Sequence, residues 1–245
     1  IASSSLLLYQ ITFALNLNSA SKFKEASSVF YSLYNLDPKN EGKSLQNAAI
    51  LAVQSSDYKL GQKIYEEFYK SDYFANGVTY YAINKSTGVE EDLVSKENRT
   101  KLISLGLYEK PRDEKISNSK PETLKLLTIL YTENGELVKA KEAYAEARKL
   151  SPNDEELKTG EFNLYFNEGY SGLANETKLV DEINAARADK KKYDELLEQR
   201  KTMFQKTIPS FEKAYSINPT DANTKSILKM AYEITGQIEK AKAIN

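Results

Sequence analysis

Apolar side chains recur at spacings of three and four residues over 121–152, which predicts two consecutive amphipathic helices. Leu124, Leu127 and Tyr131 fall on one face of the first helix. The pair Asn134-Gly135 then interrupts the pattern, because both residues tolerate the left-handed conformation in which many helices end. The stretch therefore predicts a helical hairpin. The apolar face of its second helix consists of Leu137, Ala140, Ala143, Tyr144 and Ala147.

The order of these residues resembles the tetratricopeptide (TPR) repeat, which is about 34 residues long. The resemblance is carried by Leu-x2-Leu-Thr-x2-Tyr, then Ala-x3-Tyr, then Ala147 and Pro152. Leu124, Thr128 and Tyr144 stand where the family pattern has Trp, Gly and Phe. The resemblance implies an all-α fold, a right-handed superhelical solenoid of helix-turn-helix repeats whose concave face holds another protein.

The same pattern divides the chain into an N-terminal part, 1–110, a polar linker, 111–120, and a C-terminal part, 121–245. A helix over Gly77–Asn84 is expected to open the third unit of the N-terminal part, which is degenerate. The predicted units are 7–40, 41–74 and 75–110 in the first part, and 121–154, 155–221 and a truncated 222–245 in the second.

A helical insertion of the repeat at 155–221 is expected at about 171–203, because the second helix of that repeat is delayed. Two apolar stripes predict a projecting hairpin whose second helix has roughly 28 residues. Pro209 lies inside that helix and is expected to kink it. The stripes are Leu179, Ile183 and Ala186, and then Tyr193, Leu196, Leu197, Phe204, Ile208, Phe211 and Tyr215.

The first predicted helix is apolar nearly all round between Leu6 and Leu17. A terminal repeat of a solenoid should instead present a polar outer face. We infer that another repeat or a bound partner covers this helix, and that the chain is a fragment of a longer array. Gln10, Thr12 and Asn16 make the run too polar for a membrane span, and it is also too short.

The amino-acid composition excludes several classes of ligand and of catalytic site. The 245 residues contain 34 Lys plus Arg and 35 Asp plus Glu, so the net charge of -1 gives no electrostatic case for binding nucleic acid or an anionic membrane. Cys and His are both absent, which excludes disulfides, the usual zinc sites, thiol nucleophiles and the commonest general base. Carboxylate pairs are frequent but stand at helix starts, where the helix dipole accounts for them. We predict no enzymatic activity, no cofactor and no metal.

The resemblance implies that variable positions on the first helix of each repeat line a peptide-binding groove. For any one position, packing between helices is an equally good interpretation. A basic clamp for a carboxylate terminus is not expected, because Ile11 and Leu15 occupy two of its positions and only Asn47 fits it. The candidate groove residues are Gln46, Asn47, Ile50, Gln54, Thr79, Ile83, Lys125 and Ile129.

We therefore expect a protein-protein interaction scaffold that binds a peptide or protein partner in its concave groove. The alternative is a structural assembly or self-association module, a possible homo-oligomer, that uses the apolar N-terminal helix and the inserted hairpin. The insertion and the Asn-Pro that follows it resemble those of exported bacterial TPR proteins, which implies a periplasmic location; the cytoplasm stays open. The sequence names no partner.

Overall fold

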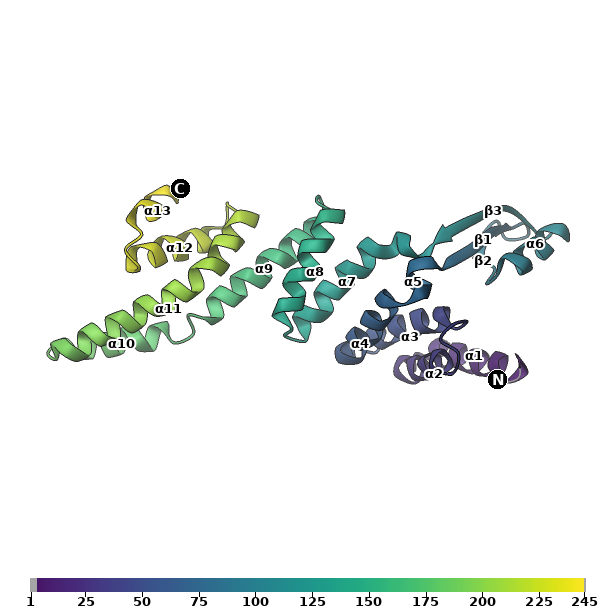
Figure 1. Cartoon of the computed structure of the whole chain (residues 1–245), viewed down its shortest axis with the longest axis horizontal. Helices are drawn as coiled ribbons and strands as arrows, with labels where there is room; N and C mark the ends of the chain where they lie inside the picture. Colours follow the sequence, from purple (N-terminus) through teal and green to yellow (C-terminus); the bar gives the residue numbers. More distant parts are fainter. Residues whose placement is uncertain (1–3, 245) are drawn as a thin grey trace. The chain divides into compact units, whose positions relative to one another are not determined.

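The computed structural model describes residues 4–244, with the side chains of residues 6–244 (Figure 1). The described chain is mostly helical, as predicted, but it also contains a small three-stranded antiparallel sheet, which corrects the all-α expectation. It forms two compact units, one ending at Leu150 and one beginning at Ser151.

Three helical hairpins make up most of the first unit. The second helix of one hairpin packs on the first helix of the next: α2 packs on α3, and α4 packs on α7. The helices of the three hairpins are α1 (Ser4–Ser19) and α2 (Phe23–Leu36), α3 (Gly42–Gln54) and α4 (Tyr58–Lys70), and α7 (Lys120–Glu133) and α8 (Leu137–Leu150).

Small side chains let α2 and α3 approach closely. Ala26, Ala48 and Ala52 are completely buried, and Phe30 and Leu45 fill the space around them. At the same contact the hydroxyl of Ser27, also fully buried, donates a 2.8 Å hydrogen bond to the backbone carbonyl of Ala48. A buried hydroxyl without a partner would cost free energy, so this bond fixes which way α2 faces α3.

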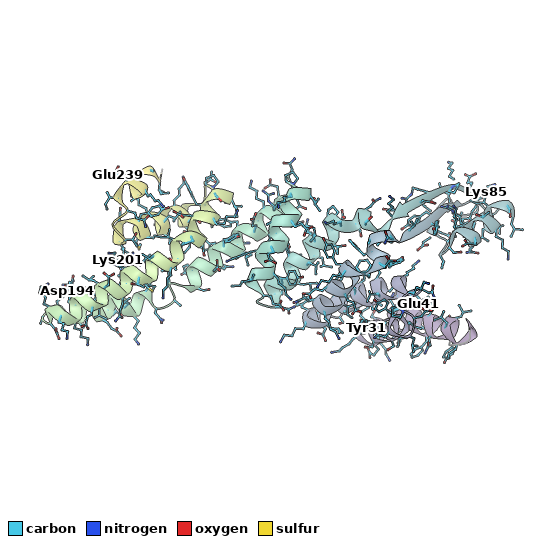
Figure 2. All side chains as sticks on the ribbon, in the orientation of Figure 1. Tyr31, Glu41, Lys85, Asp194, Lys201 and Glu239 are labelled. Carbon is cyan, nitrogen blue, oxygen red and sulfur yellow. The ribbon has the colours of Figure 1, made fainter. Side chains whose placement is uncertain are left out.

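A mixed module lies between the second and third hairpins, where a degenerate helical repeat was expected. Its strands form an antiparallel sheet in the order β2-β1-β3. Figure 2 labels Lys85 at the end of this module furthest from α5. The elements are α5 (Asp72–Asn76), β1 (Val78–Asn84), β2 (Glu90–Asp92), α6 (Lys96–Ser104), β3 (Tyr108–Lys115) and the 3-10 helix η1 (Ile116–Ser119).

Two sequence predictions are wrong in this module. The helix expected over Gly77–Asn84 is strand β1, because its β-branched and aromatic residues favour an extended chain and Tyr81 and Ile83 share the face opposite buried Ala82. The linker expected over 111–120 instead contains the end of β3, all of η1 and the start of α7.

One buried cation joins α6 to the sheet. The guanidinium of Arg99 forms a 2.6 Å ion pair with Asp113 and donates a 2.8 Å hydrogen bond to the carbonyl of Arg112. It also donates to the carbonyl of Tyr81 and lies over the ring of Tyr80. The module is too small for a large apolar core, so these polar contacts hold its layers together.

The second unit contains a short helical hairpin and a longer one. Helix α11 spans 28 residues, the length that its apolar stripe predicts, and Pro209 lies inside it. Its second half packs on α9 and α12, and its first half packs on α10 through Ile183, Ala186 and Leu196. The helices are α9 (Glu155–Ser171), α10 (Glu176–Ala185), α11 (Lys190–Ile217), α12 (Ala222–Ile234) and α13 (Ile238–Ala243).

Candidate peptide-binding groove

A groove of about 240 Å³ lies between α1 and α3 of the first unit. Phe23 and Phe30 of α2 form part of its lining, with Leu51 of α3. Phe30 and Leu51 are almost completely buried, at 3% and 4% exposure, so they make a rigid apolar floor. The remaining lining residues are Leu15, Asn18, Asn47, Ile50 and Gln54.

The helical repeat explains how α3 supplies both the groove and the core. Ala48 and Ala52 lie four residues apart on the face that packs against α2. Asn47, Ile50 and Gln54 follow one another at spacings of three and four, so they form a second stripe beside the first. The groove wall on α3 is therefore fixed by the same packing that forms the core.

The lining combines apolar surface with amide groups and contains no ionisable residue. Leu15 is 50% exposed and Ile50 is 39% exposed, so both can lose further contact with water. Within residues 4–244, the side-chain amides of Asn18, Asn47 and Gln54 have no hydrogen-bond partner. Each amide offers both a donor and an acceptor. The groove can therefore hold one apolar side chain and the peptide groups on either side of it.

An ion pair between Lys24 and Asp57 lies just beyond the end of α3. The ammonium of Lys24 lies 2.8 Å from the carboxylate of Asp57, which also caps the start of α4 by accepting from the backbone N–H of Leu60. The hydrogen bond from Lys24 lowers the pKa of Asp57, and the same bond raises the pKa of Lys24. The two opposite charges compensate each other, and neither residue is part of the groove lining.

The structure brings together three of the eight candidate residues, Asn47, Ile50 and Gln54. Gln46 is also on α3 but does not line the groove, and Lys125 and Ile129 lie on α7, away from it. Thr79 and Ile83 lie on strand β1, so their placement on a groove helix is wrong.

The structure adds Leu15 and Asn18 to the candidate residues. Both come from α1, three residues apart. For Leu15 the sequence carried one signal, since the TPR resemblance related its position to a peptide clamp; for Asn18 it carried none.

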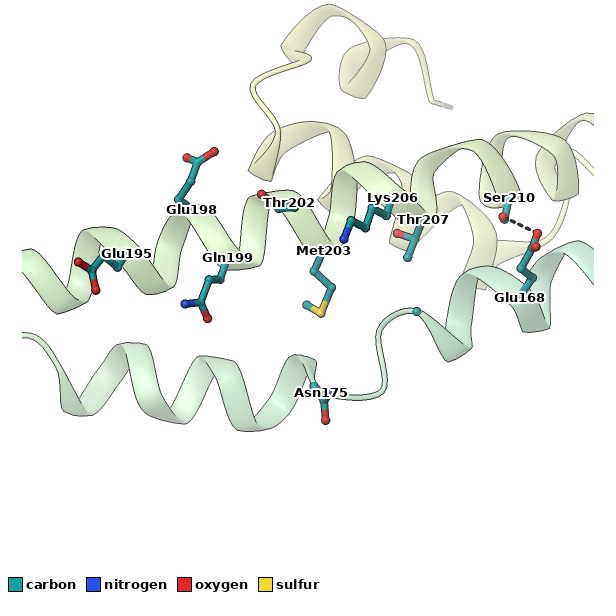
Figure 3. A pocket seen from close by; sticks show the side chains of 11 residues that line it. Glu168, Asn175, Glu195, Glu198, Gln199, Thr202, Met203, Lys206, Thr207 and Ser210 are labelled. Carbon is teal, nitrogen blue, oxygen red and sulfur yellow. Dashed lines mark hydrogen bonds between the residues drawn. The ribbon is translucent and has the colours of Figure 1, made fainter.

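A larger cleft of about 800 Å³ lies in the second unit, between α11 and the turn that joins α9 to α10 (Figure 3). Met203 points into the space between α11 and the start of α10, and Ser210 donates a 2.7 Å hydrogen bond to Glu168. Glu195 and Lys206 are among the remaining lining residues, and both are exposed. Carboxylates, an ammonium, amides and a thioether line this open cleft together, so its lining does not point to one ligand chemistry. The sequence predicted the hairpin but not this cleft.

The described residues offer neither a metal site nor a membrane-spanning helix. No group of three or more Asp or Glu residues is arranged to hold a metal ion in the part of the chain that the structure covers. No helix between residues 4 and 244 combines the length and the apolar character that a membrane crossing needs.

The chain matches no protein-family model, and a comparison with curated proteins gives no match. Similar solved structures include MamA AMB-1, with 13% identity, a TM-score of 0.38, and coverage of 98% of this chain and 87% of that one. YrrB, described as a TPR protein with an unusual peptide-binding site, has 14% identity, a TM-score of 0.38, and coverage of 96% and 80%. A tetratricopeptide repeat protein from Parabacteroides merdae has 14% identity, a TM-score of 0.39, and coverage of 97% and 77%. These likenesses are too distant to transfer any property to this chain.

Proposed function

We propose that this chain is a non-enzymatic adaptor that binds an uncharged segment of a protein partner in the groove between α1 and α3. The observation that carries the proposal is the lining itself. Three amides that form no hydrogen bond with another described residue lie beside two half-exposed aliphatic side chains, Leu15 and Ile50, and the described lining contains no ionisable residue.

The size of the groove supports a peptide rather than a small cofactor. At about 240 Å³ it is smaller than typical small-molecule sites, which begin at about 300 Å³. A groove of this size accepts one anchoring side chain of a longer segment. The partner's flanking peptide groups can then bond to Asn47 and Gln54, which stand on either side of Ile50 along α3.

The absence of charge in the lining defines the class of segment. A charged side chain would lose its hydration on entering the groove without meeting an opposite charge, which is unfavourable. A branched aliphatic side chain loses no such hydration and gains contact with Phe30 and Leu51. We therefore expect segments that contain a Leu, Ile or Val anchor between uncharged residues.

Selection from a displayed random-peptide library tests the proposal. Wild-type protein should enrich uncharged peptides that contain a branched aliphatic anchor. Ile50→Asp, which places a carboxylate in the groove at an already half-exposed position, should not retain them. Ile129→Asp is the matched control, because Ile129 is 46% exposed and lies outside the groove. Enrichment of charged peptides, or equal retention by Ile50→Asp, would refute the proposal.

A further inference from the structure

The turn 102–108, which joins α6 to β3, presents exposed aliphatic side chains among uncharged neighbours. Leu105 is 61% exposed and Leu107 is 50% exposed. Among the described residues outside the helices, Leu105 is the one exposed Leu, Ile or Val with no charged residue within three positions on either side. The turn therefore has the composition that the groove between α1 and α3 is expected to select.

Backbone hydrogen bonds hold this turn in one shape. Gly106 adopts a φ of 76°, the left-handed conformation in which many helices end. Its N–H donates a 2.9 Å hydrogen bond to the carbonyl of Ile103, and the N–H of Leu107 donates a 3.1 Å bond to the carbonyl of Leu102. Leu105 is therefore presented on a preformed turn, which loses little conformational entropy when it binds.

The polar groups of the turn complement those of the groove. The carbonyls of Leu105 and Gly106 accept no hydrogen bond from another described residue. A methyl group added at Gly106 would meet no atom of another part of the described chain within 4 Å, so the backbone is open to close approach there. The side-chain amides of Asn47 and Gln54 in the groove can donate to such carbonyls. Neither surface carries a charge that would have to lose its hydration.

We propose that the turn 102–108 of one copy of this chain binds in the groove between α1 and α3 of a second copy, with Leu105 as the anchoring side chain. This inference rests on the proposed function, because it names a segment that the groove holds. Leu105 does not line the groove of its own chain. Lys85, whose N–H donates to the carbonyl of Leu107, marks the end of the sheet module furthest from α5 in Figure 2. The turn is therefore accessible to a second copy.

The contact joins two different surfaces, which determines how copies associate. After one contact forms, the pair keeps a free turn on one copy and a free groove on the other, so further copies can add in the same way. A turn of seven residues is well below the roughly 20–30 residues per side of a standard interface. We therefore expect weak association that reverses on dilution.

Sedimentation equilibrium of the full chain over a dilution series measures this association. The average mass of wild type should rise with concentration. Leu105→Asp places a carboxylate on the anchor and Ile50→Asp places one in the groove. Each should raise the dissociation constant at least about tenfold, which corresponds to about 1.4 kcal/mol. A wild-type chain that stays monomeric throughout, or a Leu105→Asp variant that associates like wild type, overturns the proposal.

Val94→Asp is the matched control on the same module. Val94 is 72% exposed and lies two residues from both Asp92 and Lys96, so it does not have the uncharged neighbours of Leu105. Its φ of 68° is easier for Asp than for a β-branched residue, so the fold should tolerate the change. This variant should associate like wild type, and a loss of association equal to that of Leu105→Asp contradicts the choice of anchor.

Mixing the two defective variants tests the pairing of turn with groove. Leu105→Asp keeps an intact groove, and Ile50→Asp keeps an intact turn. An equal mixture should therefore form pairs and stop there, because the remaining turn and the remaining groove are both blocked. A mixture in which both variants stay monomeric contradicts the proposal.

A library-selected peptide separates this inference from the proposed function. Added in excess, such a peptide should return associated wild type to monomer, because both ligands need the same groove. Wild type that binds the peptide but never associates refutes only the pairing of copies. Wild type that stays associated while the peptide occupies the groove shows that another surface joins the copies, which also refutes it.

Discussion

Buried polar residues in this structure each hold two particular elements together. Arg99 is the clearest case, because its side chain is 8% exposed while its partner Asp113 is 55% exposed. The cation therefore depends on the strand carbonyls of Tyr81 and Arg112 as well as on the carboxylate. Ser27 likewise links α2 to α3 through its hydrogen bond to the carbonyl of Ala48. At this scale a few satisfied polar groups set which faces meet, while apolar area supplies most of the stabilisation.

Replacing Arg99 should destabilise the sheet module locally. Arg99→Met removes the donor to two strand carbonyls and leaves Asp113 unpaired, and we expect a loss of about 2 kcal/mol in the free energy of local opening. Asp113→Asn should cost less than about 1 kcal/mol, because that carboxylate is more than half exposed. Hydrogen exchange of the amides of β1 and β3 measures both changes. Equal effects of the two variants would show that the ion pair, not the carbonyl contacts, holds the module.

Secondary-structure elements were predictable where an apolar stripe was long and regular. The stripe from Tyr193 to Tyr215 gave the full length of α11, because spacings of three and four over many turns fit only a helix. The module at 72–119 was not predictable in this way. Strand β1 is seven residues long and shows only one fully buried residue, Ala82, so its alternation was too short to exclude a helix.

Only the part of the candidate groove that lies on a single helix was predictable from the sequence. Asn47, Ile50 and Gln54 were predicted together because all three lie on one regular helix, α3, whose spacing places them on one face. Lys125 and Ile129 did not join them, because their grouping assumed a continuous series of repeats through 75–110. An inserted sheet module breaks that series, and spacing along the chain carries no information about which later helix returns to a given surface.

At the scale of the whole molecule, exposed ion pairs connect helices in both units. Glu146 lies 2.7 Å from Lys120 in the first unit, and Glu212 lies 2.8 Å from Lys240 in the second. The hydrogen bond from Lys120 lowers the pKa of Glu146, and the hydrogen bond from Lys240 lowers that of Glu212. A carboxyl whose pKa is lower in the folded state stabilises the fold above its unfolded pKa, and that contribution disappears as the pH falls through the folded pKa.

Stability should therefore be constant between about pH 6 and 8 and fall on acidification below the ordinary glutamate pKa of 4.5. The chain contains no histidine, so no side chain with an ordinary pKa titrates near neutrality. Urea midpoints across the pH range measure this dependence. Glu146→Gln should show a smaller loss in acid than wild type, and added salt at about 1 M should reduce the loss because these pairs are exposed. A midpoint that changes steeply between pH 6 and 8 would contradict the account.

The central claim is that the groove between α1 and α3 holds the partner, and calorimetry with a library-selected, uncharged peptide tests it most directly. Titration into wild type and Ile129→Asp should give the same affinity. Titration into Ile50→Asp should give an affinity weaker by at least about tenfold, since a carboxylate would then face an apolar anchor. Unchanged affinity for Ile50→Asp, with its fold verified by circular dichroism, would contradict the claim.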